Sequence, residues 1–207
     1  AQMKQIAELS RQWGDGRLYN TTRQNFEFHH VKRENVEALI HELGLIGLGT
    51  LHSNSLLDVA ACPGTSFCSL AVTSSQGAAR VLMKEFYSRH YEEEPALKRL
   101  RINISGCPNS CAKHQIADIG FSGGLTEIGG IRRYGYQLYV GGRFEGERVA
   151  GGAMIKKGIP DDRVFPIADT LLEIYREGRT SPEEEFSDFV DRLGQERLVK
   201  ILDEKLS

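Results

Sequence analysis

The sequence of 207 residues lacks the features that mark several large classes of protein. No apolar run approaches the roughly 18 to 20 residues that a membrane-spanning helix needs, and residues 1–13 do not follow a basic, then apolar, then small-residue signal layout. The 26 Lys and Arg residues against 28 Asp and Glu leave a formal charge of -2, without a basic block that could neutralise several phosphates. The sequence therefore predicts a cytoplasmic protein that binds neither membranes nor nucleic acid.

Proline is scarce and internal repeats are absent, so no linker sequence marks a domain boundary sharply. The chain has 6 Pro but 22 Gly, a glycine share of about 11% against a usual value of roughly 7%. Because this glycine does not form linker-like tracts, it indicates that bare backbone is needed at many points. The length allows a small domain beside a larger one. The best candidate for the boundary is the segment 44–55, and we expect domains at 1–52 and 53–207.

Hydrophobic periodicity in the first 45 residues predicts a helix, a strand and a second helix. Apolar residues have helical spacing in 2–13 and in 36–43, and both runs stop at a glycine. Between them, residues 17–31 alternate, with Phe26 and Phe28 on one face of the expected strand. The opposite face is expected to be polar and to carry Arg23, Asn25, Glu27 and His29.

The rest of the chain mixes both periodicities, which predicts an α+β protein with a helical C-terminal part. We expect a helix at 77–90 that buries Val81, and another that begins near Ser181, where a Ser-Pro-Glu-Glu run resembles a capping box. Short strands are expected at 100–104, 116–121 and 136–140.

All four cysteines fall into two brackets, Cys62 with Cys68 and Cys107 with Cys111, with five and three residues between the partners. Two disulfides are possible arithmetically, but a chain without an export signal keeps its thiols reduced, which favours a metal. Structural zinc usually takes pairs separated by two to four residues in a small knuckle. A 4Fe-4S cluster needs four thiolates and close backbone N–H groups. Small or hydrogen-bonding residues in and beside the brackets therefore favour the cluster: Gly64, Thr65, Ser66, Gly106, Asn109 and Ser110.

Residues 105–111, Ser-Gly-Cys-Pro-Asn-Ser-Cys, followed by Asp-Ile-Gly-Phe at 118–121, resemble the signature of nitrite and sulfite reductases that carry sirohaem and a 4Fe-4S cluster. Residues 61–68 are similar to the other cysteine bracket of that family. The Thr-Arg-Gln-Asn-Phe run at 22–26 resembles its sirohaem-facing strand, and Val-Gly-Gly-Arg at 140–143 resembles a further family stretch. The resemblance implies a small ferredoxin-like α/β lobe at 1–52, followed by a larger mixed α+β domain at 53–207 that binds both cofactors.

The resemblance also implies roles for individual residues. The cluster ligands would be Cys62, Cys68, Cys107 and Cys111, and Cys111 would also be the axial ligand of the sirohaem iron. Sirohaem carries many carboxylates, which need cationic or N–H partners when they are buried. The residues expected to bind this cofactor, besides Cys111, are Arg23, Asn25, His29, Asn109, Arg132 and Arg133. The residues expected to act on the substrate are Arg23, His29 and Lys113.

The chain departs from the family pattern in two ways. Larger members contain two copies of this plan, whereas this chain has one, and the resemblance favours a small single-module enzyme of the assimilatory sulfite reductase type. In the expected strand, Tyr19 and Glu27 stand where the family pattern has Arg and Gln, and both changes remove positive character. We therefore expect other cations to be recruited around the anionic substrate, and the nearest candidates in the sequence are Lys113, His114, Arg132 and Arg133.

The implied activity is six-electron reduction of sulfite to sulfide or of nitrite to ammonia, with sulfite favoured. Because the chain has no dinucleotide-binding glycine fingerprint, we expect electrons from a ferredoxin-like or other small donor protein. Lys156 with Lys157, or residues 98–101, are candidate landing patches for the donor. The alternatives are a non-catalytic iron–sulfur electron-transfer subunit and a fragment of a larger two-copy reductase, while a zinc scaffold would be colourless.

Overall fold

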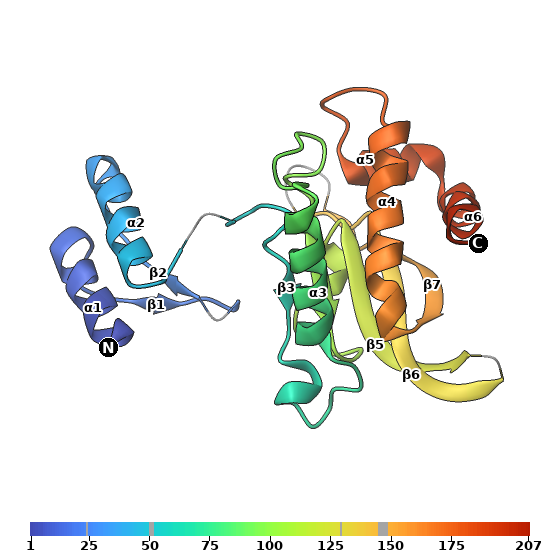
Figure 1. Ribbon diagram of the computed structural model, residues 1–207, viewed down its shortest axis with the longest axis horizontal. Coiled ribbons are helices and arrows are strands. Elements are labelled where there is room, and N and C mark those ends of the chain that lie inside the picture. Colours follow the sequence, from blue (N-terminus) through green and yellow to red (C-terminus); the bar gives the residue numbers. More distant parts are fainter. Residues whose placement is uncertain (24, 50–51, 129, 145–148) are drawn as a thin grey trace. The chain divides into compact units, whose positions relative to one another are not determined.

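The computed structural model describes residues 1–207 except 24, 50–51, 129 and 145–148. The chain forms two compact units, Ala1–Ser53 and Asn54–Ser207, and each is described by itself (Figure 1). Both units combine helices and strands, which confirms the α+β prediction. Among the described residues, no helix is both long and apolar enough to cross a membrane.

The smaller unit consists of two helices and a short hairpin. Helix α1 spans Gln2–Trp13 and α2 spans Val36–Leu45, preceded by a 3-10 turn at Arg33–Asn35. Strands β1 (Tyr19–Asn20) and β2 (Phe26–Glu27) pair antiparallel between the helices. The helices bury a small core through three apolar side chains: Ile6, Leu39 and Leu43.

The single strand predicted for residues 17–31 is wrong, because the chain turns back within it. The Thr21 hydroxyl accepts hydrogen bonds from the backbone N–H groups of Arg23 (3.2 Å) and Asn25 (3.0 Å). The Thr21 N–H also donates to the Asn25 carbonyl at 2.9 Å, which closes the turn. Threonine side chains compete in this way with extended backbone pairing. Arg23 and Asn25 therefore lie in a turn and do not share a strand face with Glu27 and His29.

The larger unit is built on a five-stranded sheet in the order β3-β4-β5-β6-β7. Strands β3, β4 and β5 run parallel, and β5, β6 and β7 run antiparallel. Helix α3 (Ser75–Ser88) makes the crossover from β3 to β4. The strand bounds are Ala60–Ala61, Ile102–Ser105, Ile119–Ile128, Ile131–Val140 and Ala153–Ile159.

Helices α3 and α4 (Val164–Gly178) lie side by side over one face of this sheet (Figure 1). Helix α5 (Phe186–Leu193) and helix α6 (Gln195–Leu206) follow. Helix α3 buries Ala79, Leu82 and Phe86. The expectation that Val81 is buried is wrong, since its side chain is 50% exposed. It lies beside the Leu82 and Phe86 stripe and not on it.

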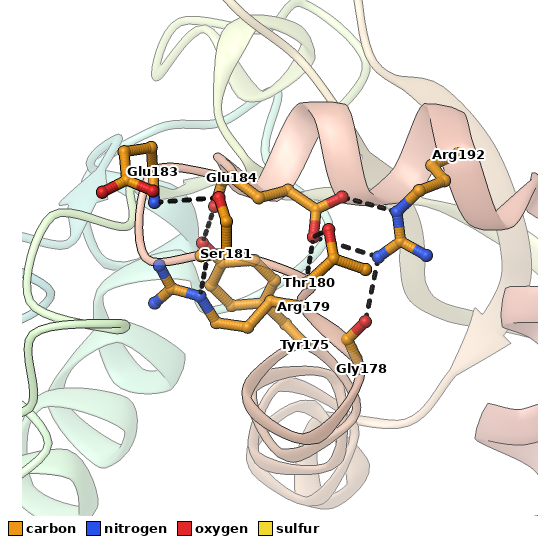
Figure 2. A network of polar contacts seen from close by, with 8 residues as sticks. All are labelled: Tyr175, Gly178, Arg179, Thr180, Ser181, Glu183, Glu184 and Arg192. Atoms are coloured by element: carbon orange, nitrogen blue, oxygen red, sulfur yellow. Dashed lines mark hydrogen bonds and ion pairs between the residues drawn. The ribbon is translucent and has the colours of Figure 1, made fainter.

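The helix expected to begin near Ser181 starts instead at Phe186, and a polar turn precedes it (Figure 2). The Glu184 carboxylate accepts hydrogen bonds from the Thr180 N–H (2.7 Å) and from Arg192 Nε (2.6 Å). The Ser181 hydroxyl accepts from the Glu183 N–H at 3.2 Å, which makes a local turn. These two side chains bind the N–H groups of Thr180 and Glu183 within a turn, in place of the reciprocal contacts of a capping box.

Candidate metal centre

The two cysteine brackets begin at the same edge of the sheet. Cys62 follows β3 directly, and residues 106 and 107 follow β4, the parallel neighbour of β3. Parallel neighbours end at one edge, and the Cys62 N–H donates to the Ile104 carbonyl at 3.1 Å. We call residues 62–74 the first cysteine loop and residues 106–118 the second cysteine loop. In Figure 1 the chain after β3 lies at the same side of the larger unit as the end of β5 and the start of β6.

The two loops are packed tightly against each other. The backbone N–H groups of Val72 (2.9 Å) and Thr73 (3.2 Å) both donate to the Gly106 carbonyl. A Cβ atom on Gly106 would lie only 3.0 Å from the Gly64 Cα and 3.1 Å from the Ala71 Cβ. Bare backbone is therefore required where the loops meet, which gives a structural reason for glycine at these two positions.

The sulfur of Cys62 lies among hydrogen-bond donors. The Gly106 N–H points at this sulfur at 3.1 Å, and the Ser75 hydroxyl oxygen lies 3.4 Å from it. Such donors stabilise the negative charge of a metal-bound thiolate and set the potential of an iron–sulfur cluster. The first bracket therefore fits a metal-bound cysteine in its chemistry as well as in its spacing.

All four cysteines are free thiols, so the disulfide alternative is wrong for this structure. Cys107 is buried, Cys62 and Cys68 are half-buried, and Cys111 is exposed. The cysteine that the family resemblance assigns to both cofactors is thus the most exposed of the four. An exposed sulfur can take a second large group without displacing packed protein.

The second cysteine loop holds two residues in the left-handed conformation, Ser110 (φ +58°) and Lys113 (φ +56°). The Lys113 N–H donates to the Ser110 carbonyl at 2.7 Å, and the Ser110 hydroxyl donates to the Gln115 side-chain carbonyl. The side chains of Asn109 and Lys113 are exposed on either side of Cys111 in the sequence. Both are therefore accessible to a group bound at this cysteine.

His114 is buried and anchors the loop, a role that the sequence did not reveal. Its Nδ1 atom lies 3.1 Å from the Ser105 hydroxyl, and its ring packs on Tyr139 with 4.7 Å between the centroids. Burial lowers the pKa of His114 to about 4, so the ring is neutral at pH 7. The expectation that His114 supplies a positive charge is wrong.

Arg132 and Arg133 lie on β6. Strands β5 and β6 form a hairpin that extends beyond the end of β4. The register of β4 with β5 ends at Ser105 and Ser122, and β5 continues to residue 128 past the edge that holds the cysteine loops. Both arginines are exposed. Because neighbours on a strand point to opposite faces, only one of them can serve a ligand on a given face.

Arg23, Asn25 and His29 belong to the smaller unit. Arg23 and Asn25 are exposed in the hairpin turn. The His29 ring stacks on Tyr19 with 3.9 Å between centroids and 11° between planes, and its Nε2 atom lies 3.0 Å from the Glu27 carboxylate. The two residues that depart from the family pattern are thus both direct neighbours of His29.

Comparisons with known proteins agree over nearly the whole chain. The family model of the nitrite and sulphite reductase 4Fe-4S domain matches residues 52–207, and that of the nitrite/sulfite reductase ferredoxin-like half domain matches residues 1–46. The chloroplastic ferredoxin–nitrite reductase of Oryza sativa subsp. japonica is 35% identical over 188 residues, which are 89% of this chain and 30% of that protein. Sulfite reductase (ferredoxin) 1 of Mycolicibacterium paratuberculosis is 28% identical, over 93% of this chain and 35% of its own length.

Two solved structures share the fold. The NirA protein of Mycobacterium tuberculosis superposes with a TM-score of 0.78 at 28% identity, covering 95% of this chain and 36% of that one. Dissimilatory sulfite reductase I gives a TM-score of 0.73 at 13% identity, which shows likeness of fold alone. The chain spans about a third of the length of the curated relatives described above.

Proposed function

The chain belongs to the nitrite and sulphite reductase family that contains the 4Fe-4S domain, and from this premise we propose that it binds a 4Fe-4S cluster and sirohaem. The cluster ligands are Cys62, Cys68, Cys107 and Cys111, and the exposed Cys111 also ligates the sirohaem iron. The observation that carries the proposal is the meeting of both cysteine loops at one sheet edge, where the Gly106 N–H donates to the Cys62 sulfur at 3.1 Å.

The proposed reaction is six-electron reduction of sulfite to sulfide. Nitrite, which would be reduced to ammonia, is the second candidate substrate. The cofactors supply electron transfer and an iron site for the anion. The protein has to neutralise the anion's oxygens and deliver the protons with which these oxygens leave as water. The candidates for this work are Lys113, beside Cys111, and Arg23 and His29, from the smaller unit.

The carboxylates of sirohaem require cationic or amide partners. Asn109 is exposed in the second cysteine loop, and Arg132 and Arg133 are exposed on the hairpin that runs past the same edge. We assign Asn109 and one of the two arginines to the cofactor's periphery, together with Asn25 from the turn of the smaller unit. Opposite strand faces make one of the two arginines the stronger candidate.

The proposed electron donor is a small acidic protein of the ferredoxin kind. Of the two basic patches in the sequence, the one at Lys156 is partly neutralised, because its ammonium lies 2.6 Å from the Asp203 carboxylate. Lys98 and Arg99 are exposed and form the better landing patch. A positive patch chiefly accelerates the encounter with an acidic partner, so its effect depends on salt.

The test is anaerobic preparation of the full chain, with iron and sulfide analysis, absorption spectra and a methyl-viologen assay with both anions. The proposal expects about five irons per chain, four from the cluster and one from sirohaem, with about four sulfides, a tetrapyrrole Soret band and anion-dependent oxidation of the dye. A Cys111→Ser variant should lose both spectra, whereas Ser88→Ala, which changes an exposed side chain of α3, should keep them. A cluster without a tetrapyrrole would support the electron-transfer subunit instead, and a colourless zinc protein would refute the proposal.

A further inference from the structure

The Ser75 hydroxyl is shared between two atoms of one cysteine. Ser75 is fully buried in the first turn of α3. Its oxygen lies 2.8 Å from the Cys62 carbonyl oxygen and 3.4 Å from the Cys62 sulfur. In the free thiol both contacts are satisfied at once, because the hydroxyl donates to the carbonyl and the S–H donates to the hydroxyl oxygen.

When Cys62 is a metal-bound thiolate, these two hydrogen bonds can no longer form at the same time. The sulfur then has no proton to donate and can only accept, so the carbonyl and the sulfur compete for the single hydroxyl proton. The other donor at this sulfur, the Gly106 N–H at 3.1 Å, belongs to the backbone and cannot turn away. Of these two donors at the Cys62 sulfur, only the serine hydroxyl can rotate.

Packing keeps Ser75 in this position. A Cβ atom on Gly64 would lie 2.4 Å from the Ser75 hydroxyl oxygen and 2.8 Å from its nitrogen. The Ser75 N–H donates to the Thr73 carbonyl at 3.1 Å, which fixes the start of the helix against the first cysteine loop. The hydroxyl can therefore rotate, but the side chain cannot withdraw from Cys62.

We propose that Ser75 is a positioning residue that raises the reduction potential of the cluster by donating its hydroxyl hydrogen bond to the Cys62 thiolate. The inference rests on the proposed function, because it requires the cluster. On reduction one electron from an added reductant enters the cluster, no covalent bond forms or breaks, and the proton stays on the serine oxygen. The added negative charge strengthens the hydrogen bond to sulfur, which favours the reduced state.

The experiment is a dithionite titration of the full chain, with the reduced cluster followed by electron paramagnetic resonance. We expect Ser75→Ala to shift the oxidised-to-reduced equilibrium about tenfold toward the oxidised form, which is about 59 mV more negative for a one-electron couple. Ser75→Thr keeps the hydroxyl and should stay close to wild type. Ser88→Ala, which removes an exposed hydroxyl at the other end of α3, should not shift the potential.

The outcomes separate this inference from the proposed function. An unchanged potential in a fully loaded Ser75→Ala protein overturns the inference, as does an equal shift in Ser75→Thr. A Ser75→Ala chain that takes up no iron also counts against it, because the hydroxyl would then build the site and not tune it. A wild-type chain that binds no cluster refutes the proposed function itself.

Discussion

Replacing Gly64 by alanine would insert a methyl group where the first cysteine loop packs on α3. The Cβ atom would lie 2.4 Å from the Ser75 hydroxyl oxygen, 2.8 Å from the Ser75 nitrogen and 3.1 Å from the Thr73 carbonyl oxygen. Two of these three neighbours are backbone atoms, so the crowding cannot be relieved by a side-chain rotation alone. Gly64 also has φ +60°, in the left-handed region. The substitution therefore combines a clash with backbone strain.

The two contributions have known sizes. A non-glycine residue held in an unfavourable backbone region costs about 1–3 kcal/mol, and overpacking by a methyl group costs about 1–3 kcal/mol. Gly130 separates them, because it has φ +79° and a Cβ atom at this position would meet no atom within 4 Å beyond its chain neighbours. Gly130→Ala should therefore show the strain alone. Gly151→Ala meets no atom within 4 Å and has no left-handed φ, so it should be close to neutral.

The assay is urea unfolding of the apoprotein followed by circular dichroism, together with iron uptake under anaerobic conditions. We expect the free energy of unfolding to fall most for Gly64→Ala, by about 1–3 kcal/mol more than for Gly130→Ala. Only Gly64→Ala should also lose iron uptake. The reasoning is refuted if Gly64→Ala is as stable as Gly151→Ala, or if it takes up iron as wild type does.

Three other side chains give further predictions. Arg192 and its neighbours lower the pKa of Glu184 to about 2, so this carboxylate contributes stability above the ordinary carboxyl pKa of about 4.5 that is lost as pH falls through about 2. Glu184→Gln should therefore cost about 1–2 kcal/mol in neutral urea unfolding and nothing near pH 2; an equal cost at both values would contradict this. Burial lowers the pKa of His114 to about 4, so wild-type stability should fall as pH decreases from about 6.5 to 4, and His114→Asn should flatten that slope in thermal scans. Glu27→Gln removes a negative charge 3.0 Å from His29. Under the proposed function it should lower the KM for sulfite severalfold with kcat little changed. An unchanged KM would show that this carboxylate does not affect binding of the anion.

The α+β class and most helices could be predicted from the sequence because hydrophobic periodicity is a local signal. The meeting of the two cysteine loops could not, because it depends on pairing between distant segments. Strand β3 has only two residues, Ala60 and Ala61, and gives no periodic pattern. Its register with β4 nevertheless decides that Cys62 lies beside Gly106.

Two of the errors have local physical causes. Alternation in residues 17–31 indicated one strand, but a threonine hydroxyl that accepts two backbone N–H groups stabilises a turn at its centre. In the same way, the Ser181 hydroxyl accepts a hydrogen bond from the Glu183 N–H and forms a turn where the sequence predicted a helix cap. His114 gave no signal, because burial of a histidine depends on tertiary packing and leaves no pattern in the residues around it.

The candidate centre has a packed side and an open side, and they divide the expected effects of mutation. On the packed side, Gly64, Ser75 and Gly106 surround Cys62 with close backbone contacts and hydrogen-bond donors. Changes there should alter stability, cluster uptake or reduction potential, because the same contacts hold the loop and surround the sulfur. On the open side, Cys111 and Lys113 are exposed, so changes there should alter what binds without altering the fold. Under the proposed function both properties are needed, since a rigid cluster site has to adjoin a site that an anion can enter.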